Sequence, residues 1–173
     1  VLANGMAGNE EIVLGTEAYE TFAAALHEVN EYLAKKIAGD GEGATALFEV
    51  NIVGAATKEQ AVLLSKAIAC SNLTKTAIAG HDANWGRIIC AMGYSGADFD
   101  PEKVDLFFES AAGKIQIAEN GVALDFSEAK ATEILSQPVV IATADVKMGD
   151  ANATAWGCDL THAYIEINAD YRS

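Results

Sequence analysis

The chain has 173 residues, of which 51% are apolar, so it can bury the core of one domain or of two tightly packed lobes. Its 25 acidic and 11 basic side chains give a net charge of −14, which disfavours nucleic acid and anionic lipid as partners and favours cationic small molecules. No apolar run approaches the roughly 20 residues of a membrane span, and no charged-then-apolar signal opens the chain. We therefore expect a globular, cytoplasmic protein.

The cysteines and the first residues of the chain lead to two further predictions. Cys70, Cys90 and Cys158 lie far apart, form no CxxC motif and have no His pair at metal-ligand spacing near them. We expect reduced thiols and no metal site. The opening string VLANG lacks the Met of a native start, so we expect a processed or truncated terminus.

The first part of the chain predicts a helix, a strand and a second helix. Thr16 is a plausible N-cap, and apolar residues then recur at three- and four-residue steps, which predicts a long amphipathic helix that ends at Gly39. The run ALFEVNIVGA predicts a mostly buried strand. Thr57 follows as the expected cap of a second helix, KEQAVLLSKAIAC.

A shorter helix and a hairpin are predicted next. The string NWGRIICAMGY predicts the helix, with Asp82 available to cap it. The runs VDLFFES and GKIQIAENGVAL alternate, and Asn120-Gly121 is a strong hairpin signal.

The last part of the chain predicts one helix and three strands. Ser127 is the expected cap of the helix, VVIATADV is a strand, and ATAWGCDLTHAYIEINADYRS reads as two strands. The predicted fold class is α/β in an α+β layered arrangement, with helices packed on antiparallel or mixed sheets rather than a doubly wound parallel sheet. We expect residues 1–173 to form a single domain-sized unit.

The residues alone predict no self-contained active site. GYSG at Gly93 to Gly96 is one residue short of a nucleophile elbow and follows a helix instead of a strand. His81 and Cys90 could form a thiolate pair only if the fold brought them together. His27, in the middle of a helix, and His162, in a predicted strand, are each expected to be surface or packed histidines.

Glu42, in the string GDGEGAT, has two interpretations. It is a solvated charge in a turn after a helix that ends at Gly39, or it is a carboxylate that binds a ligand. Gly41 and Gly43 would let backbone and ligand approach closely in the second case, and an ammonium group is the natural partner. The string by itself favours the solvated charge.

Four strings, taken in order along the chain, carry a family resemblance. They are VLANG, GDGEGATALFEV, TKTAIAGHDANWGRIICAMGYSG and AWGCDLTHAYIEINADYRS. Together they resemble the ornithine acetyltransferase (glutamate N-acetyltransferase) family of arginine biosynthesis. The strings DANWGR and INADYRS make the resemblance specific, because they are unusual rather than common turn sequences.

Members of this family resemble proteins that cut themselves into two chains and expose an N-terminal Thr, whose hydroxyl attacks an acetylated amino acid. The resemblance implies that this chain is the C-terminal part of the beta chain. The nucleophile Thr would lie upstream of Val1, and the oxyanion donors would lie in a companion alpha chain. It implies no catalytic residue in this chain, which should be inactive alone.

The resemblance also implies the reaction and its partners. The acetyl group would pass from N2-acetylornithine to glutamate through an acetyl-threonine, with no bound cofactor. Some relatives also use acetyl-CoA as a co-substrate to acetylate glutamate, whereas others only recycle the acetyl group. The sequence does not distinguish these two types. The family suggests two copies of each chain and a fold similar to that of self-cleaving aminopeptidases.

Three residues match substrate-binding positions of the family: Glu42, Asn168 and Ser173. Asn168 would bind through its two-sided amide, and Ser173 through its hydroxyl or the terminal carboxylate. With the resemblance, ligand binding becomes the preferred interpretation of Glu42. The tail that holds Asn168 and Ser173 could instead fray, as chain ends commonly do.

Two other functions remain as alternatives. A self-cleaving, aminopeptidase-like hydrolase would pass the acyl group to water instead of to an amino acid. A non-catalytic acidic module would bind an amino acid or a partner chain without reaction.

Overall fold

A computed structural model of the protein describes residues 1–170. Contacts between Cα atoms divide the chain into two compact units, Val1–Ala34 and Lys35–Ser173. The elements, in chain order, are α1 (Glu17–Gly39), β1 (Leu47–Ala55), α2 (Lys58–Cys70), α3 (Asn72–Ala79), α4 (Trp85–Gly93), the 3-10 helix η1 (Pro101–Lys103), β2 (Asp105–Ser110), β3 (Gly113–Glu119), β4 (Val122–Ala123), α5 (Glu128–Leu135), β5 (Val139–Asp145), β6 (Ala151–Cys158) and α6 (His162–Asp170).

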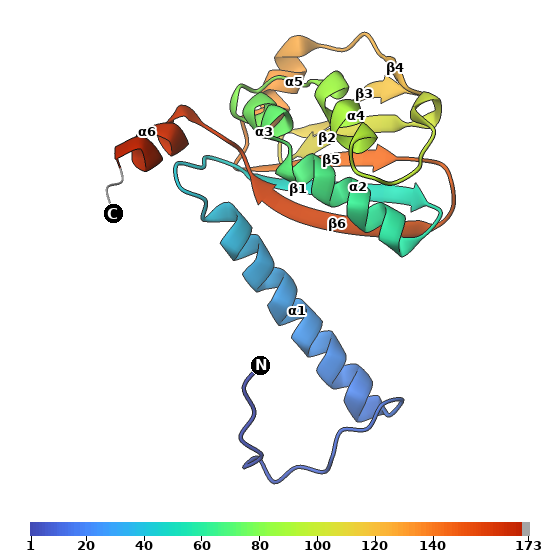
Figure 1. Ribbon diagram of the computed structural model, residues 1–173, viewed down its shortest axis with the longest axis vertical. Helices are drawn as coiled ribbons and strands as arrows, with labels where there is room; N and C mark the ends of the chain where they lie inside the picture. The colour runs from blue at the N-terminus through green and yellow to red at the C-terminus, as the bar shows by residue number, and fades with distance from the viewer. Residues whose placement is uncertain (171–173) are drawn as a thin grey trace. The chain divides into compact units, whose positions relative to one another are not determined.

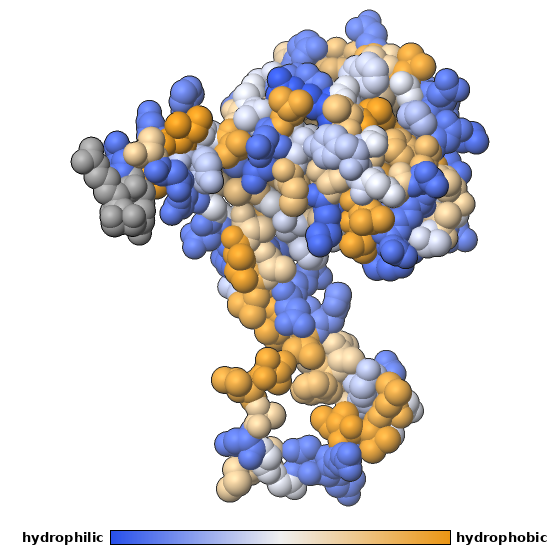
Figure 2. All heavy atoms as spheres, viewed as in Figure 1, coloured by the Kyte–Doolittle hydropathy of each residue, from blue (hydrophilic) through white to orange (hydrophobic). Residues whose placement is uncertain are grey.

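The first unit is an extended N-terminal segment followed by most of α1. Thr16 caps this helix, because its hydroxyl oxygen accepts a hydrogen bond from the Tyr19 N–H at 3.3 Å. The predicted long helix is confirmed, but none of its residues is buried. Its apolar positions Phe22, Val29 and Leu33 are 46%, 54% and 49% exposed. Figure 2 shows hydrophobic side chains along the surface of α1 and of the N-terminal segment.

The second unit is built on one six-stranded mixed sheet with the strand order β4-β3-β2-β5-β1-β6. β1 and β5 run parallel, whereas every other neighbouring pair in this sheet is antiparallel. The predicted hairpin turn at Asn120-Gly121 joins β3 to β4. The α/β layered class with a mixed sheet is therefore confirmed.

Helices cover one face of the sheet (Figure 1). Phe48, Val50 and Ile52 on β1 alternate with partly exposed residues and are fully buried, and Val140 on β5 is buried on the same side. α2 packs on β1 and β6, and α5 packs on β2 and β3. Burying each of these aliphatic or aromatic side chains stabilises the fold by about 1.5–3 kcal/mol.

The opposite face of the sheet is partly exposed and polar near β6. Trp156 Nε1 donates to Glu49 Oε2 at 2.8 Å, and Thr154 Oγ1 donates to Asn51 Oδ1 at 2.6 Å. Each of these bonds joins cross-strand neighbours in the antiparallel β1–β6 register. Lys35 Nζ lies 3.7 Å from Glu49 Oε2 and 5.4 Å from the centre of a Trp156 ring.

Side-chain caps fix where the helices of the second unit begin. Thr57 caps α2 and Ser127 caps α5, as the sequence predicts. Ser71 caps α3, a helix that the sequence analysis missed inside a connection.

The prediction that Asp82 caps α4 is wrong. Asn84 accepts from the Arg87 N–H at 3.1 Å and is the cap, while Asp82 Oδ2 accepts from Asn84 Nδ2 at 2.9 Å. Asn84 directly precedes the first helical residue, Trp85, so its oxygen reaches the third helical N–H, whereas Asp82 lies two residues too early. Asp82 orients the cap instead.

The last element is also different from the prediction. The second of the two strands expected at the end of the chain is the helix α6, and His162 is its first residue. Backbone bonds from the Asp159 N–H to Ala46 O (3.2 Å) and from the Leu160 N–H to Lys75 O (3.2 Å) hold the chain as it leaves β6. A helix then satisfies its backbone groups internally, which a strand without a neighbour cannot do.

In residues 1–170, each helix is too short or too polar to cross a lipid bilayer.

Candidate functional site

The candidate site lies where two connections meet, residues 40–46 between α1 and β1 and residues 159–161 between β6 and α6 (Figure 1). Asp159 joins them and is only 2% exposed. Its Oδ1 accepts from the N–H groups of Thr45 (2.8 Å) and Ala46 (3.1 Å), and its Oδ2 accepts from the Thr45 hydroxyl at 2.6 Å. A buried carboxylate is stable only when it is hydrogen-bonded in this way.

Gly43 brings the first connection against the start of α6. Its φ is +70°, and a Cβ placed on it would lie 2.8 Å from both Ala163 Cβ and the Tyr164 backbone nitrogen. Thr161 Oγ1 donates to the Gly43 carbonyl at 2.6 Å. Only glycine combines this left-handed backbone with such a close approach.

Glu42 and Asn168 meet at this point. Asn168 Nδ2 donates to Glu42 Oε2 at 2.9 Å and also to the Tyr164 carbonyl, one helical turn earlier, at 2.9 Å. The fold therefore brings together two of the three residues that the resemblance assigns to substrate binding, from positions 126 residues apart. Within residues 1–170, no salt bridge includes Glu42, and its side chain is exposed. The Glu42 carboxylate can therefore form an ion pair with a positively charged group of a ligand.

Ser173, the third of these residues, lies outside the described residues.

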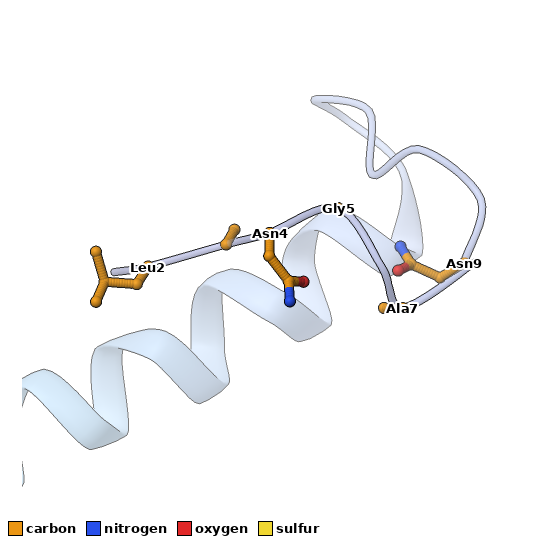
Figure 3. A pocket seen from close by; sticks show the side chains of 6 residues that line it. Leu2, Asn4, Gly5, Ala7 and Asn9 are labelled. Carbon is orange, nitrogen blue, oxygen red and sulfur yellow. The ribbon is translucent and has the colours of Figure 1, made fainter.

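A cavity of about 420 Å³ adjoins the site through Thr161. Its lining is mostly apolar and comes from the end of α3 with the glycine that follows it, from the connection before α6 and from the first turn of α6: Thr76, Ala79, Gly80, Leu160, Thr161, His162 and Ile165. A further hollow of about 570 Å³ is formed by the N-terminal segment between Leu2 and Asn9 (Figure 3). Its side chains include the amides Asn4 and Asn9 but no titratable group, so it offers no acid or base.

The other candidates from the sequence form no catalytic pair. His81 Nδ1 lies 3.4 Å from Ser136 Oγ, and Cys90 is exposed on α4, so the described contacts do not join His81 to Cys90. His27 lies in α1, 3.9 Å from Glu31. Over residues 1–170 no group of three or more His, Cys, Asp or Glu side chains is placed to hold a metal ion.

Asp159 and Thr161 are the residues at this site that the sequence analysis did not single out. Both lie in the string CDLTH, which the sequence analysis places within the two strands expected at the end of the chain. Their partners lie more than 100 residues earlier, so periodicity and spacing carry no signal for them.

Comparison with known proteins extends over the whole chain. The model of the ArgJ family matches residues 1–173. The arginine biosynthesis bifunctional protein ArgJ of Thermotoga neapolitana is 54% identical over 173 residues, 100% of this chain and 44% of that protein. The protein of the same name from Caldanaerobacter subterraneus subsp. tengcongensis is 51% identical over 100% of this chain and 43% of that protein. The chain spans less than half the length of these curated relatives.

A solved structure shares both fold and sequence. The crystal structure of arginine biosynthesis bifunctional protein argJ from Bacillus halodurans matches with a TM-score of 0.90 and 43% identity, over 98% of this chain and 78% of that chain. Because the family model covers every residue and the fold agrees over almost all of them, the chain belongs to the ArgJ family.

Proposed function

We propose that this chain is part of an acetyltransferase of arginine biosynthesis, which moves the acetyl group of N2-acetylornithine to glutamate. The observation that carries the proposal is the contact between Glu42 and Asn168, which presents an exposed carboxylate without a cationic protein partner among residues 1–170. Acetylornithine keeps its side-chain ammonium when its α-amine is acetylated. A charge-assisted hydrogen bond from that ammonium to Glu42 contributes about 1.5–3 kcal/mol when the bound substrate excludes water from the carboxylate.

The nucleophile is proposed to be a Thr upstream of Val1, made N-terminal by self-cleavage. Its hydroxyl attacks the acetyl carbonyl, and its own α-amine takes the hydroxyl proton. An O–C bond forms, the amide C–N bond breaks, and the proton passes to the departing ornithine amine. The amine of glutamate then attacks the acetyl ester, which releases the threonine hydroxyl and gives N-acetylglutamate.

The lengths of the relatives support a protein divided into two chains. The crystallised Bacillus halodurans chain is only about a quarter longer than its match to this chain, whereas the two curated relatives are more than twice as long as this chain. A precursor cut near its middle would give this difference. The companion alpha chain and two copies of each chain follow as proposals from the family resemblance.

The exposed apolar surface of α1 supports a close partner. Phe22, Val29 and Leu33 recur on this helix and are each about half exposed. Apolar surface of this kind normally meets another chain or another part of the same protein. We propose that the companion chain covers it.

The proposed transfer needs no bound cofactor, because the threonine carries the acetyl group. Acetyl-CoA would enter only as a second acetyl donor, and the word bifunctional in the relatives' names leaves room for it. A cytoplasmic location remains a prediction from the sequence.

The test separates the proposed transferase from its two alternatives. The protein expressed from its full reading frame is incubated with N2-acetylornithine, with and without glutamate, and its products are measured. A transferase forms N-acetylglutamate in amounts equal to the ornithine released, and it turns over only when glutamate is present. Steady release of acetate without glutamate would indicate the hydrolase, and binding without any product would indicate the non-catalytic module.

A further inference from the structure

We propose that Asp159 and Thr161 are positioning residues, which hold Glu42 and Asn168 at the separation that receives the substrate ammonium. The inference rests on the proposed function, since it concerns the same site. Neither residue touches the substrate in this proposal. Asp159 holds the connection that carries Glu42, and Thr161 holds both this connection and the start of α6, which carries Asn168.

Asp159 fixes the connection that carries Glu42. All three hydrogen bonds of its side chain go to Thr45 and Ala46, three and four residues after Glu42, and its backbone N–H donates to the Ala46 carbonyl. Its oxygens therefore face the α1–β1 connection and do not cap the helix that follows it. A carboxylate that is 2% exposed and bound by three donors leaves this segment little freedom.

Thr161 fixes the same connection next to Glu42 and, at the same time, the start of α6. Its hydroxyl donates to the Gly43 carbonyl at 2.6 Å, and Gly43 lies against Ala163 and Tyr164. Tyr164 in turn supplies the carbonyl that accepts from Asn168 Nδ2. The short segment of residues 159–161 thus fixes the position of the backbone that carries Glu42 and of the backbone that carries Asn168.

The hydrogen bonds of Asp159 and Thr161 matter energetically because Glu42 lies on an exposed connection. A solvated glutamate loses side-chain and backbone freedom when it binds a ligand, and that loss weakens binding. Holding the connection before the ligand arrives removes part of this cost. Binding geometry must be kept within about 0.5 Å for the full contact energy, which a freely moving connection would not provide.

The test uses Thr161→Val and Asp159→Asn in the protein from the full reading frame. Thr161→Val removes one hydroxyl and keeps the side-chain shape. Asp159→Asn keeps one oxygen for the two N–H donors, so it should fold where a larger change would not. Ser127→Ala is the matched control, because it also removes one hydroxyl hydrogen bond, that of the α5 cap, from a part of the fold outside the site.

The expected result is a rise of about three- to tenfold in KM for N2-acetylornithine, with kcat largely retained, for both site variants but not for Ser127→Ala. Each variant is also combined with Glu42→Gln. If Asp159 and Thr161 act through Glu42, the rise disappears in the Glu42→Gln background. Equal effects in both backgrounds, or no effect on KM in the single variants, would overturn the proposal.

A second readout keeps the inference separate from the proposed function. The side-chain amide signals of Asn168 are followed by NMR after selective labelling of asparagine, in the wild-type protein, in Thr161→Val and in Ser127→Ala. The proposal requires these signals to move toward solvent-exposed values in Thr161→Val alone. If Glu42→Gln itself leaves acetylornithine kinetics unchanged, the substrate role of Glu42 fails, and unmoved Asn168 signals would then overturn the positioning role as well.

Discussion

Asn168 donates a hydrogen bond of 2.9 Å to the carboxylate of Glu42, across 126 residues of sequence. The amide comes from α6 and the carboxylate from the connection between α1 and β1, so neither element makes the contact alone. The same amide nitrogen donates to the Tyr164 carbonyl, which orients it on its own helix. The carboxylate of Glu42 is therefore held by an amide donor while its side chain stays exposed.

Replacing Glu42 by Gln should impair the use of N2-acetylornithine. The change keeps the side-chain shape and removes the charge that we propose binds the substrate ammonium. We expect a loss of about 1.5–3 kcal/mol in transition-state terms, or roughly ten- to a hundredfold in kcat/KM. The self-cleavage that we propose should survive, and the assay must use the cleaved protein.

Glu102→Gln is the control for this variant, because it removes a charge from the exposed 3-10 helix η1. Unchanged acetylornithine kinetics in a fully cleaved, folded Glu42→Gln protein would make Glu42 a solvated loop charge.

The order of substrate binding provides a second prediction. A single site that keeps the acetyl group on a threonine must release ornithine before glutamate enters, so the kinetics should be ping-pong. Double-reciprocal plots at several glutamate concentrations should give parallel lines, and mass spectrometry should detect an acetylated threonine. Intersecting lines together with an unmodified threonine would exclude this route.

Gly43→Ala should destabilise the protein by about 1–3 kcal/mol. The added Cβ would meet Ala163 and the Tyr164 backbone at 2.8 Å, on a residue whose φ of +70° disfavours any side chain. The free energy of unfolding in denaturant measures the effect. Gly93→Ala is the matched control, because a Cβ there meets nothing within 4 Å, and it should leave stability equal or slightly higher. Equal stabilities of the two variants would show that α6 does not pack on Gly43 as described.

The two polar residues before α4 should differ in their effect on stability. Asn84→Ala removes the cap itself and should cost about 1 kcal/mol in the free energy of unfolding. Asp82→Ala removes only the side chain that orients the cap and should cost less. A larger loss for Asp82→Ala, measured by the same denaturation experiment, would contradict the assignment of Asn84 as the cap.

Residues 1–173 produced without the rest of the protein should expose apolar surface. Phe22, Val29 and Leu33 on α1 are each about half exposed, so a dye that fluoresces on apolar surfaces should bind the isolated chain. Adding the companion chain that we propose should reduce this fluorescence. A chain that is monomeric, unfolds cooperatively and binds no dye would argue against an extensive interface with a partner.

Local patterns in the sequence determine much of this fold. The helix from Glu17 to Gly39 follows from its apolar spacing and the Thr16 cap, and the β3–β4 turn follows from Asn120-Gly121. The caps at Thr57 and Ser127 lie where the sequence predicts them. Each of these features depends on residues a few positions apart, so their physical causes are contained in short strings.

The sequence by itself determined the family resemblance, the fold class and the identity of Glu42 and Asn168 as candidates. Only the tertiary structure decided that these two side chains touch, that the end of the chain is a helix instead of a strand, and that Asp159 and Thr161 hold the two connections together. Hydrogen bonds between segments far apart in the sequence make these decisions, and residues paired in this way show no periodic pattern along the chain. The α6 segment shows this most clearly, because its Tyr and Ile residues favour a strand locally while the contacts of Asp159 and Leu160 with earlier parts of the chain fix its path.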